Sequence, residues 1–273
     1  MIDRPYVEKA RDAGFGKNEL LAHDPARYLV RSIMAGMFLS IVLFVYWNLM
    51  HNLAASPFGK VLASAFFGVG LTIIVFTNAE LFTSNNMYMT VSSMERKTSW
   101  SRAVTVWVVC WIGNLIGAFI VAALLYFAGA LHDLPANHAL YVGADHKCHQ
   151  AALAIFAKGI LANWIVCLAV RVNLKCKEEI AKIAVLILVV FIFLYLGFEH
   201  SIANMGTFAM SLLGNGTITV GDALYNLCFA TLGNIVGGAV LVALPFVYLN
   251  RESGNQVQAT TTPVVGDHTP SNA

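Results

Sequence analysis

The chain has 273 residues, of which 58% are hydrophobic and only 12% are charged, whereas an ordinary soluble domain carries roughly 25% charged residues. This composition excludes a soluble globule as the starting class. The formal net charge of +2 at pH 7 is too small for a nucleic-acid-binding surface.

Six apolar regions follow one another along the chain, each near or above the roughly 20 residues that cross a bilayer. In chain order they are residues 28–50, 61–79, 103–131, 151–170, 183–198 and 223–249. They predict an all-α polytopic membrane protein with a transmembrane domain over residues 27–250. The polar segment 1–26 shows no removable signal peptide. The tail 251–273 is rich in Thr, Pro, Ser, Gly and Asn and is predicted to be disordered.

Six spans place both termini on one side of the membrane, and the distribution of Lys and Arg indicates which side that is. Fourteen of the 17 basic residues lie in segments on the side of the termini. The other three are Lys60, Lys147 and Lys158. Because cytoplasmic segments are enriched in Lys and Arg, both termini are predicted to be cytoplasmic.

Two patterns recur in the second half of the chain at almost the same offset. The block Gly-Asn-Leu-Ile-Gly at residues 113–117 is matched by Gly-Asn-Ile-Val-Gly at residues 233–237. Glu80, followed by Asn85, is matched by Glu199, followed by Asn204. Each unit then contains three spans, so the second copy enters the membrane from the opposite face. This predicts an inverted repeat, whose substrate path lies between the copies near the midplane, while the repeated glycines serve close helix packing.

The second span of each half is interrupted by polar residues, at 76–86 and at 197–205. Non-helical backbone at membrane depth is tolerated only where it is buried in protein or lines a cavity, so both stretches are predicted to be breaks inside the bundle. Glu80, Glu199 and Asn204 are predicted to support the broken helices, the two carboxylates by accepting backbone hydrogen bonds. His200 is a candidate for contact with a small anion or for proton transfer to it, the alternative being a passive buried histidine.

The connection over residues 132–150 contains four histidines and Lys147, against two acidic residues. It is predicted to be a solvated external loop that concentrates anions. Lys158 in the fourth span is predicted to reach the membrane interface. The sequence His-x-Cys-His at residues 146–149 matches no common zinc framework, so neither a metal site nor a cofactor is predicted.

Six sequence blocks resemble the formate/nitrite transporter family, and most closely its formate-channel branch. They run in family order across residues 28–249 and are Ala79–Ser84, Gly113–Gly117, Gly159–Asn163, Val166–Val170, Gly197–Met205 and Gly233–Gly238. The sequence at residues 144–147 also resembles the formate branch. Two positions depart from that branch, because Glu80 stands where an Asp is expected and Lys158 resembles the nitrite branch.

The resemblance implies an aquaporin-like six-helix protomer in a bacterial inner membrane, assembled as a homopentamer with one anion path through each protomer. It places the family's central histidine at His200, its loop threonine at Thr83, its fourth-span asparagine at Asn163 and its vestibule lysine at Lys147. It also implies apolar constrictions lined by Phe67, Leu71, Leu81, Phe82, Val166 and Phe193.

The function expected from these residues is transport, without enzymatic activity, of a small monovalent anion of a weak acid. Formate is the first candidate, lactate and acetate are further ones, and nitrite or hydrosulfide is the alternative. A bare anion faces a large desolvation barrier at apolar rings, whereas its neutral acid faces a far smaller one. We therefore expect Lys147 and Lys158 to attract the anion, and Thr83, Asn163 and His200 to bind it where it gains a proton.

Rival functions remain at this point. A membrane enzyme or receptor is disfavoured because no nucleotide loop, metal-ligand set or nucleophile with a base is found. A pore for neutral solutes fits the implied architecture but not a buried histidine. The charged N-terminal segment is a candidate lid that responds to pH.

Overall fold

The structure, a computed structural model, describes residues 3–251. The predicted disordered tail therefore lies outside the described residues, except for Arg251. The elements are helices α1 (Arg4–His23), α2 (Pro25–Asn52), α3 (Gly59–Phe76), α4 (Phe82–Met94), α5 (Trp100–Phe127), α6 (Ala139–Cys148), α7 (Ala152–Lys175), α8 (Glu179–Tyr195), α9 (Ser201–Leu213), α10 (Val220–Gly238), a π-helical turn (Ala239–Ala243) and α11 (Leu244–Tyr248). The described chain is all-helical, as predicted.

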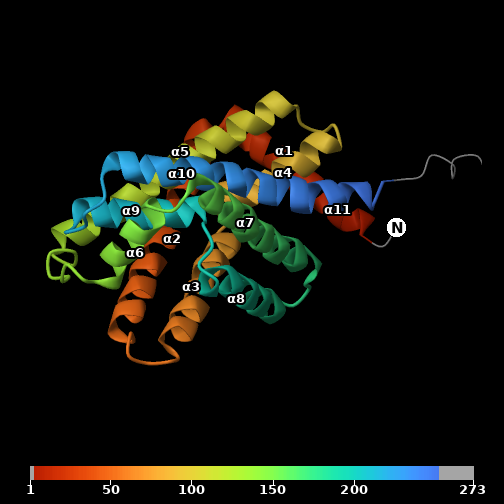
Figure 1. The fold of residues 1–273 in the computed structure, drawn as a ribbon. Helices are drawn as coiled ribbons and strands as arrows, with labels where there is room; N and C mark the ends of the chain where they lie inside the picture. Colours follow the sequence, from red (N-terminus) through yellow and green to blue (C-terminus); the bar gives the residue numbers. More distant parts are fainter. Residues whose placement is uncertain (1–2, 252–273) are drawn as a thin grey trace, which may run out of the picture.

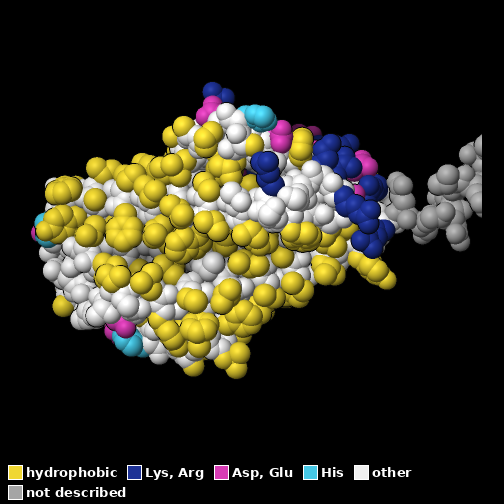
Figure 2. Space-filling model, turned by 90° about the horizontal axis from the view of Figure 1, so that it is seen from above, with side chains coloured by type: hydrophobic (Ala, Val, Ile, Leu, Met, Phe, Trp, Pro, Cys, Tyr) yellow, Lys and Arg dark blue, Asp and Glu magenta, His cyan; other side chains and the backbone are white. Residues whose placement is uncertain are grey.

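The molecule has two ends that differ in charge. Helix α11 and the N-terminus lie at one end, and α6 lies at the other (Figure 1). Lys and Arg side chains gather at the first end, while a broad belt of hydrophobic side chains covers the middle of the molecule (Figure 2). We call these the basic end and the α6 end. The belt is the surface expected of a protein surrounded by lipid.

Five helices of the described chain are long and apolar enough to cross a membrane, namely α2, α3, α5, α7 and the continuous helical stretch from α10 to α11. Helix α8 has 17 residues and is followed after a short break by α9. The pairs α3–α4 and α8–α9 are the interrupted second and fifth segments that the polar blocks predict. Both breaks contain a left-handed residue, Asn78 with φ 54° and Gly197 with φ 71°.

The two halves pack by the same contacts, because α2 lies along α5 and α7 lies along α10. The repeated glycines make these contacts close. A Cβ atom at Gly117 would lie 2.0 Å from the carbonyl oxygen of Ile33, and one at Gly237 would lie 2.3 Å from that of Ile160. No larger residue fits at either position without moving backbone, which accounts for the repeated spacing.

Helix α1 is packed against α4 and is tied to the basic end by ion pairs. Arg4 lies 2.8 Å from a carboxylate oxygen of Glu95, and Asp3 accepts a hydrogen bond of 2.8 Å from Arg171. The charged N-terminal segment is therefore an ordered helix of the bundle.

The connection over residues 132–150 is not the solvated loop that its polar composition suggests. It contains α6, whose N-cap, His138, is only 1% exposed. The Nδ1 atom of His138 accepts a hydrogen bond from the backbone N–H of Leu140, and its ring lies 4.3 Å from that of His51, measured between centroids. Helix α6 packs against α2 and α9, and this packing outweighs the solvation of its polar side chains.

His138 makes the stability of this region depend on pH. Burial, and then the nearby His51, lower the pKa of His138 from 6.5 to about 4. Between pH 6.5 and about 4 the unfolded chain therefore binds a proton at this histidine that the folded chain does not. The contribution to stability is full above pH 6.5 and is progressively lost as the pH falls to about 4. The substitution His138→Asn keeps a good N-cap but does not titrate. We expect thermal unfolding curves of this variant to lose part of the acid sensitivity of the wild type, and identical pH profiles would contradict the assignment.

Candidate functional site

The first break in the helices is held by the side chain of Asn114 on α5. Its Nδ2 donates to the carbonyl oxygens of Ser32 at 2.7 Å and Glu80 at 2.8 Å. Its Oδ1 accepts a hydrogen bond from the backbone N–H of Phe82 at 3.0 Å. One buried amide thus supplies the partners that the interrupted backbone lacks.

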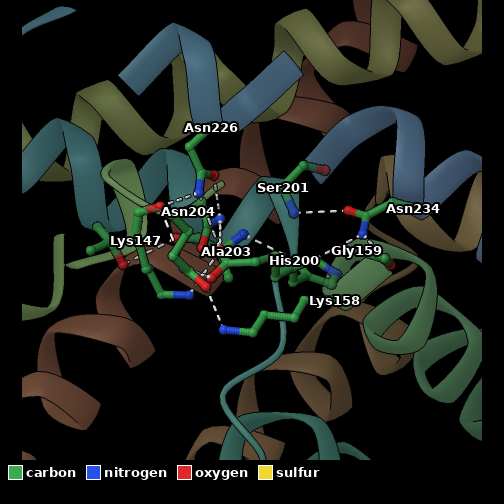
Figure 3. A network of polar contacts seen from close by, with 12 residues as sticks. Lys147, Lys158, Gly159, His200, Ser201, Ala203, Asn204, Asn226 and Asn234 are labelled. Atoms are coloured by element: carbon green, nitrogen blue, oxygen red, sulfur yellow. Dashed lines mark hydrogen bonds and ion pairs between the residues drawn. The ribbon is translucent and has the colours of Figure 1, made fainter. Parts of the chain in front are cut away.

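Asn234 on α10 does the same at the second break (Figure 3). Its Nδ2 donates to the carbonyl oxygens of Gly159 at 2.8 Å and Glu199 at 2.9 Å, and its Oδ1 accepts from the N–H of Ser201 at 2.8 Å. In the sequence, the two Gly-Asn blocks indicate the repeat, close helix packing and the family resemblance, but not this role of their asparagines. The asparagine that recurs within them was the available signal for this role.

The carboxylate of Glu80 is buried and paired with a cation from α1. Its Oε2 lies 2.6 Å from Nζ of Lys17 and accepts a hydrogen bond of 3.0 Å from Nδ2 of Asn85. Lys17 is not among the predicted site residues, because nothing along the chain indicates that α1 folds back over the first break.

Glu199 is 1% exposed and has an equivalent arrangement at the α6 end. Its Oε2 lies 3.1 Å from Nζ of Lys147 and 2.6 Å from Nδ2 of Asn204, and its Oε1 accepts from Nε2 of Gln150 at 2.9 Å. Figure 3 shows Lys147 and Asn204 converging on this cluster. We expected the carboxylates of Glu80 and Glu199 to accept backbone hydrogen bonds, but their partners are side chains.

Three cavities follow one another through the protomer. A cavity of about 500 Å³ at the basic end is lined by residues that include Lys17, Glu80 and Leu71. Another of about 210 Å³ at the α6 end is lined by residues that include Lys147, Phe193 and His200. Between them lies a cavity of about 10 Å³. Leu71 borders both the first and the central cavity, and Phe193 and His200 border both the second and the central one, so the three cavities lie along one path.

The central cavity brings together five of the six residues predicted to form constrictions. It is lined by Leu39, Phe67, Leu71, Leu81, Val166, Val190, Phe193 and His200. Leu39 and Val190 are additions that sequence cannot separate from ordinary core positions. Phe82 does not line this cavity. It borders an apolar groove on the side of the bundle with Trp107 and Ile235.

His200 is the N-cap of α9 and is hydrogen-bonded through both ring nitrogens. Nδ1 accepts from the backbone N–H of Ala203 at 3.1 Å, and Nε2 lies 2.9 Å from Oγ1 of Thr83. Because Nδ1 acts as an acceptor, the neutral ring carries its proton on Nε2. The ring therefore presents an N–H donor toward the hydroxyl of Thr83.

Asn163 and Lys158 lie beside the path in supporting positions. The Nδ2 of Asn163 donates to the carbonyl oxygens of Thr83 at 3.1 Å and Asn234 at 2.6 Å, and Asn163 is not among the residues that line the three cavities. The ammonium group of Lys158 contacts the side-chain oxygen of Gln150, and Gln150 in turn bonds Glu199. Lys158 therefore belongs to the cluster around Glu199, in addition to lying near the α6 end.

An inverted pair of interrupted helices, with a narrow and mainly apolar cavity that holds one histidine between two vestibules, defines a polytopic membrane transport protein that moves a small solute. A sequence profile described as formate/nitrite transporter matches residues 5–248. The chain therefore belongs to the formate/nitrite transporter family.

The relatives of this chain include both a nitrite transporter and a formate channel. The chain is 33% identical over 241 residues to the nitrite transporter NirC of Escherichia coli, covering 87% of this chain and 89% of NirC. It is 31% identical over 276 aligned residues to the formate channel FocA of Escherichia coli, covering 92% and 95%. Among solved structures, a pentameric formate channel with formate bound superimposes with a TM-score of 0.70 at 29% identity, covering 82% of this chain and 97% of that one. The protein is a bacterial membrane channel or transporter of the formate/nitrite type.

Proposed function

We propose that the protein conducts small monovalent anions of weak acids, with formate as the first substrate, and that the anion crosses the centre together with a proton. The observation that carries this proposal is the Thr83–His200 pair, with an Nε2-to-Oγ1 distance of 2.9 Å. His200 lines an apolar central cavity and also the vestibule at the α6 end.

Each vestibule supplies a positive charge to attract an anion, Lys17 at the basic end and Lys147 at the α6 end. Each of these two lysines is also paired with a buried carboxylate, so neither of them holds an anion as an uncompensated charge. Weak binding of this kind permits both entry and release.

The central cavity opposes the passage of a bare charge, because seven of its eight lining side chains are apolar. Desolvating an anion there is costly, and neutralising it removes most of that cost. The proton on Nε2 of His200 and the hydroxyl of Thr83 are the polar donors available at this point. In our proposal His200 first takes up a second proton from water in the vestibule, and the resulting imidazolium passes its Nε2 proton to the anion and returns to the neutral ring. The other route is delivery of the proton through water, with His200 and Thr83 as hydrogen-bond donors to the anion.

The size of the central cavity favours the smallest substrates. A volume of about 10 Å³ is close to the space that a single water molecule needs, so side chains must move for any solute to pass. An anion with three heavy atoms, such as formate or nitrite, requires less movement than acetate or lactate. Formate is placed before nitrite because residues 144–147 resemble the formate branch, and Lys147 lines the vestibule.

We also propose that the protein is a homopentamer and that both of its termini are cytoplasmic. The likeness to a pentameric formate channel supports a homopentamer with a path in each protomer. The concentration of Lys and Arg at the basic end (Figure 2) supports a cytoplasmic location for that end and for both termini.

The proposal is tested by measuring flux through the purified protein in proteoliposomes, with formate, nitrite, hydrosulfide, acetate, lactate and glycerol offered separately. We expect formate to pass fastest, lactate to pass more slowly, and formate flux to be greater at about pH 5.5 than at about pH 7.5, because protons for the transfer at the centre are more abundant at low pH. Preference for nitrite or hydrosulfide would keep the fold and the mechanism but assign the protein to another branch of the family. Glycerol flux without anion flux would overturn the proposal.

A further inference from the structure

A basic cavity lies away from the transport path, between the α4–α5 connection and the end of the last span. Its volume is about 590 Å³. It is lined by Ser93, Met94, Arg96, Lys97, Thr98, Ser99, Trp100 and Arg251. Three of these side chains are cationic, and none of the described residues that line the cavity is acidic. The neighbouring carboxylate of Glu95 is already paired with Arg4 at 2.8 Å.

The cavity also offers hydrogen-bond donors that suit an anion. Ser93 is only 6% exposed, and its hydroxyl is buried with no hydrogen-bond partner among the described residues. Such a group is costly to leave unsatisfied. Ser99 and Trp100 begin the 28-residue helix α5, whose first backbone N–H groups and dipole attract negative charge. An oxyanion with several acceptor oxygens would accept hydrogen bonds from the first N–H groups of α5, and from Ser93 when its side chain turns toward the cavity.

The position of the cavity points to the membrane surface. Trp100 is 53% exposed at the first turn of a membrane-spanning helix, and tryptophan is enriched at the boundary between lipid and water. Arg251 also lines the cavity and comes two residues after Leu249, which, like Tyr248, has an exposed apolar side chain. Charged groups thus stand beside surfaces that lie in lipid. Figure 2 shows the dark-blue Lys and Arg side chains gathered at this end.

We propose that this cavity binds the phosphate group of an anionic phospholipid, with Arg96, Lys97 and Arg251 around the phosphate and Trp100 beside the lipid backbone. Basic pockets between spanning helices are suited to such headgroups. Free phosphate has the same oxyanion chemistry, but it would gain nothing from Trp100 or the neighbouring apolar side chains. The site is independent of the transport path and of the substrate.

The test is native mass spectrometry of the purified protein with added phosphatidylglycerol or phosphatidylcholine. We expect the wild type to retain about one phosphatidylglycerol per chain in preference to phosphatidylcholine. The double variant Arg96→Gly/Arg251→Gln removes two charges from the cavity. Arg96 has φ 58°, a conformation that glycine adopts without strain, so this change relaxes the backbone. Because each basic residue near a membrane contributes about fivefold to affinity for anionic lipid, we expect about 25-fold weaker binding.

The matched control is Lys177→Gln/Lys182→Gln, which removes two charges from the α7–α8 region at the same end of the molecule. Retention of phosphatidylglycerol by the control, with loss by the Arg96/Arg251 variant, supports the site. Equal loss in both variants, or equal retention of the two lipids by the wild type, overturns it. Displacement of the lipid by an equal concentration of inorganic phosphate would assign the cavity to free phosphate and overturn the lipid assignment. The assembled mass in the same spectra reports whether each variant folds.

Discussion

Replacing His200 with Asn is expected to reduce formate flux at about pH 7.5 by about 100-fold, the lower range of what a positioned proton donor contributes. Asn is a good N-cap, so it can keep the bond to the N–H of Ala203 that Nδ1 of His200 now accepts at 3.1 Å. It has no group at the place of Nε2. The variant therefore removes the proton donor with little disturbance of α9.

The pH profile separates a proton-donating role from a structural one. Without His200, passage depends on formic acid already present in the bulk solution, so flux should change about tenfold per pH unit, as a weak acid well above its own pKa does. The wild type should show a shallower profile. Flux measurements in proteoliposomes over a series of pH values make this comparison, and an unchanged rate and profile would remove His200 from the mechanism.

Thr83 provides a control for this result. The substitution Thr83→Ser keeps the hydroxyl that lies 2.9 Å from Nε2 of His200, and Thr83→Val removes it at nearly constant volume. We expect the Ser variant to retain most of the flux and the Val variant to lose much of it. Equal fluxes in the two variants would show that the hydroxyl takes no part in transport.

Replacing Lys147 with Gln is expected to destabilise the protein by about 3–5 kcal/mol, because it leaves the buried carboxylate of Glu199 without its cation. Glu199 is 1% exposed, and the side chain of Lys147 is only 17% exposed, so water replaces the lost partner poorly. Asn204 and Gln150 remain as donors, but they are uncharged. Thermal unfolding of the detergent-purified protein, followed by the loss of its size-exclusion peak, measures the change.

The double variant Lys147→Gln/Glu199→Gln tests whether the loss comes from the unpaired charge. With both charges absent, we expect stability to return to within about 1–2 kcal/mol of the wild type. The equivalent pair at the basic end gives a second test. The substitution Lys17→Gln leaves the buried carboxylate of Glu80 without its cation, because Oε2 of Glu80 lies 2.6 Å from the Lys17 ammonium. A single variant as stable as the wild type, or a double variant no better than the single one, would contradict this account.

The class of fold could be predicted from the amino-acid sequence, because the signals for it are local. Apolar runs of membrane-spanning length identify helices without reference to their neighbours. The recurrence of Glu80 with Asn85 as Glu199 with Asn204 located both breaks, which the structure places at residues 77–81 and 196–200. Transport as the function, and the family, followed from the resemblance of these blocks and are confirmed by the match over residues 5–248.

The partners of the buried polar groups could not be predicted from sequence, because they depend on contacts between distant parts of the chain. Lys17 and Glu80 are 63 positions apart in the chain, and their pairing depends on α1 folding back against α4. Asn163 faces the backbone of the first break, and Phe82 faces a groove on the side of the bundle, although both resemble path residues in sequence. In a membrane helix nearly every side chain is apolar, on the lipid side and the core side alike. Sequence therefore marks which helices span the membrane, while helix rotation and long-range packing decide which side chains line the path.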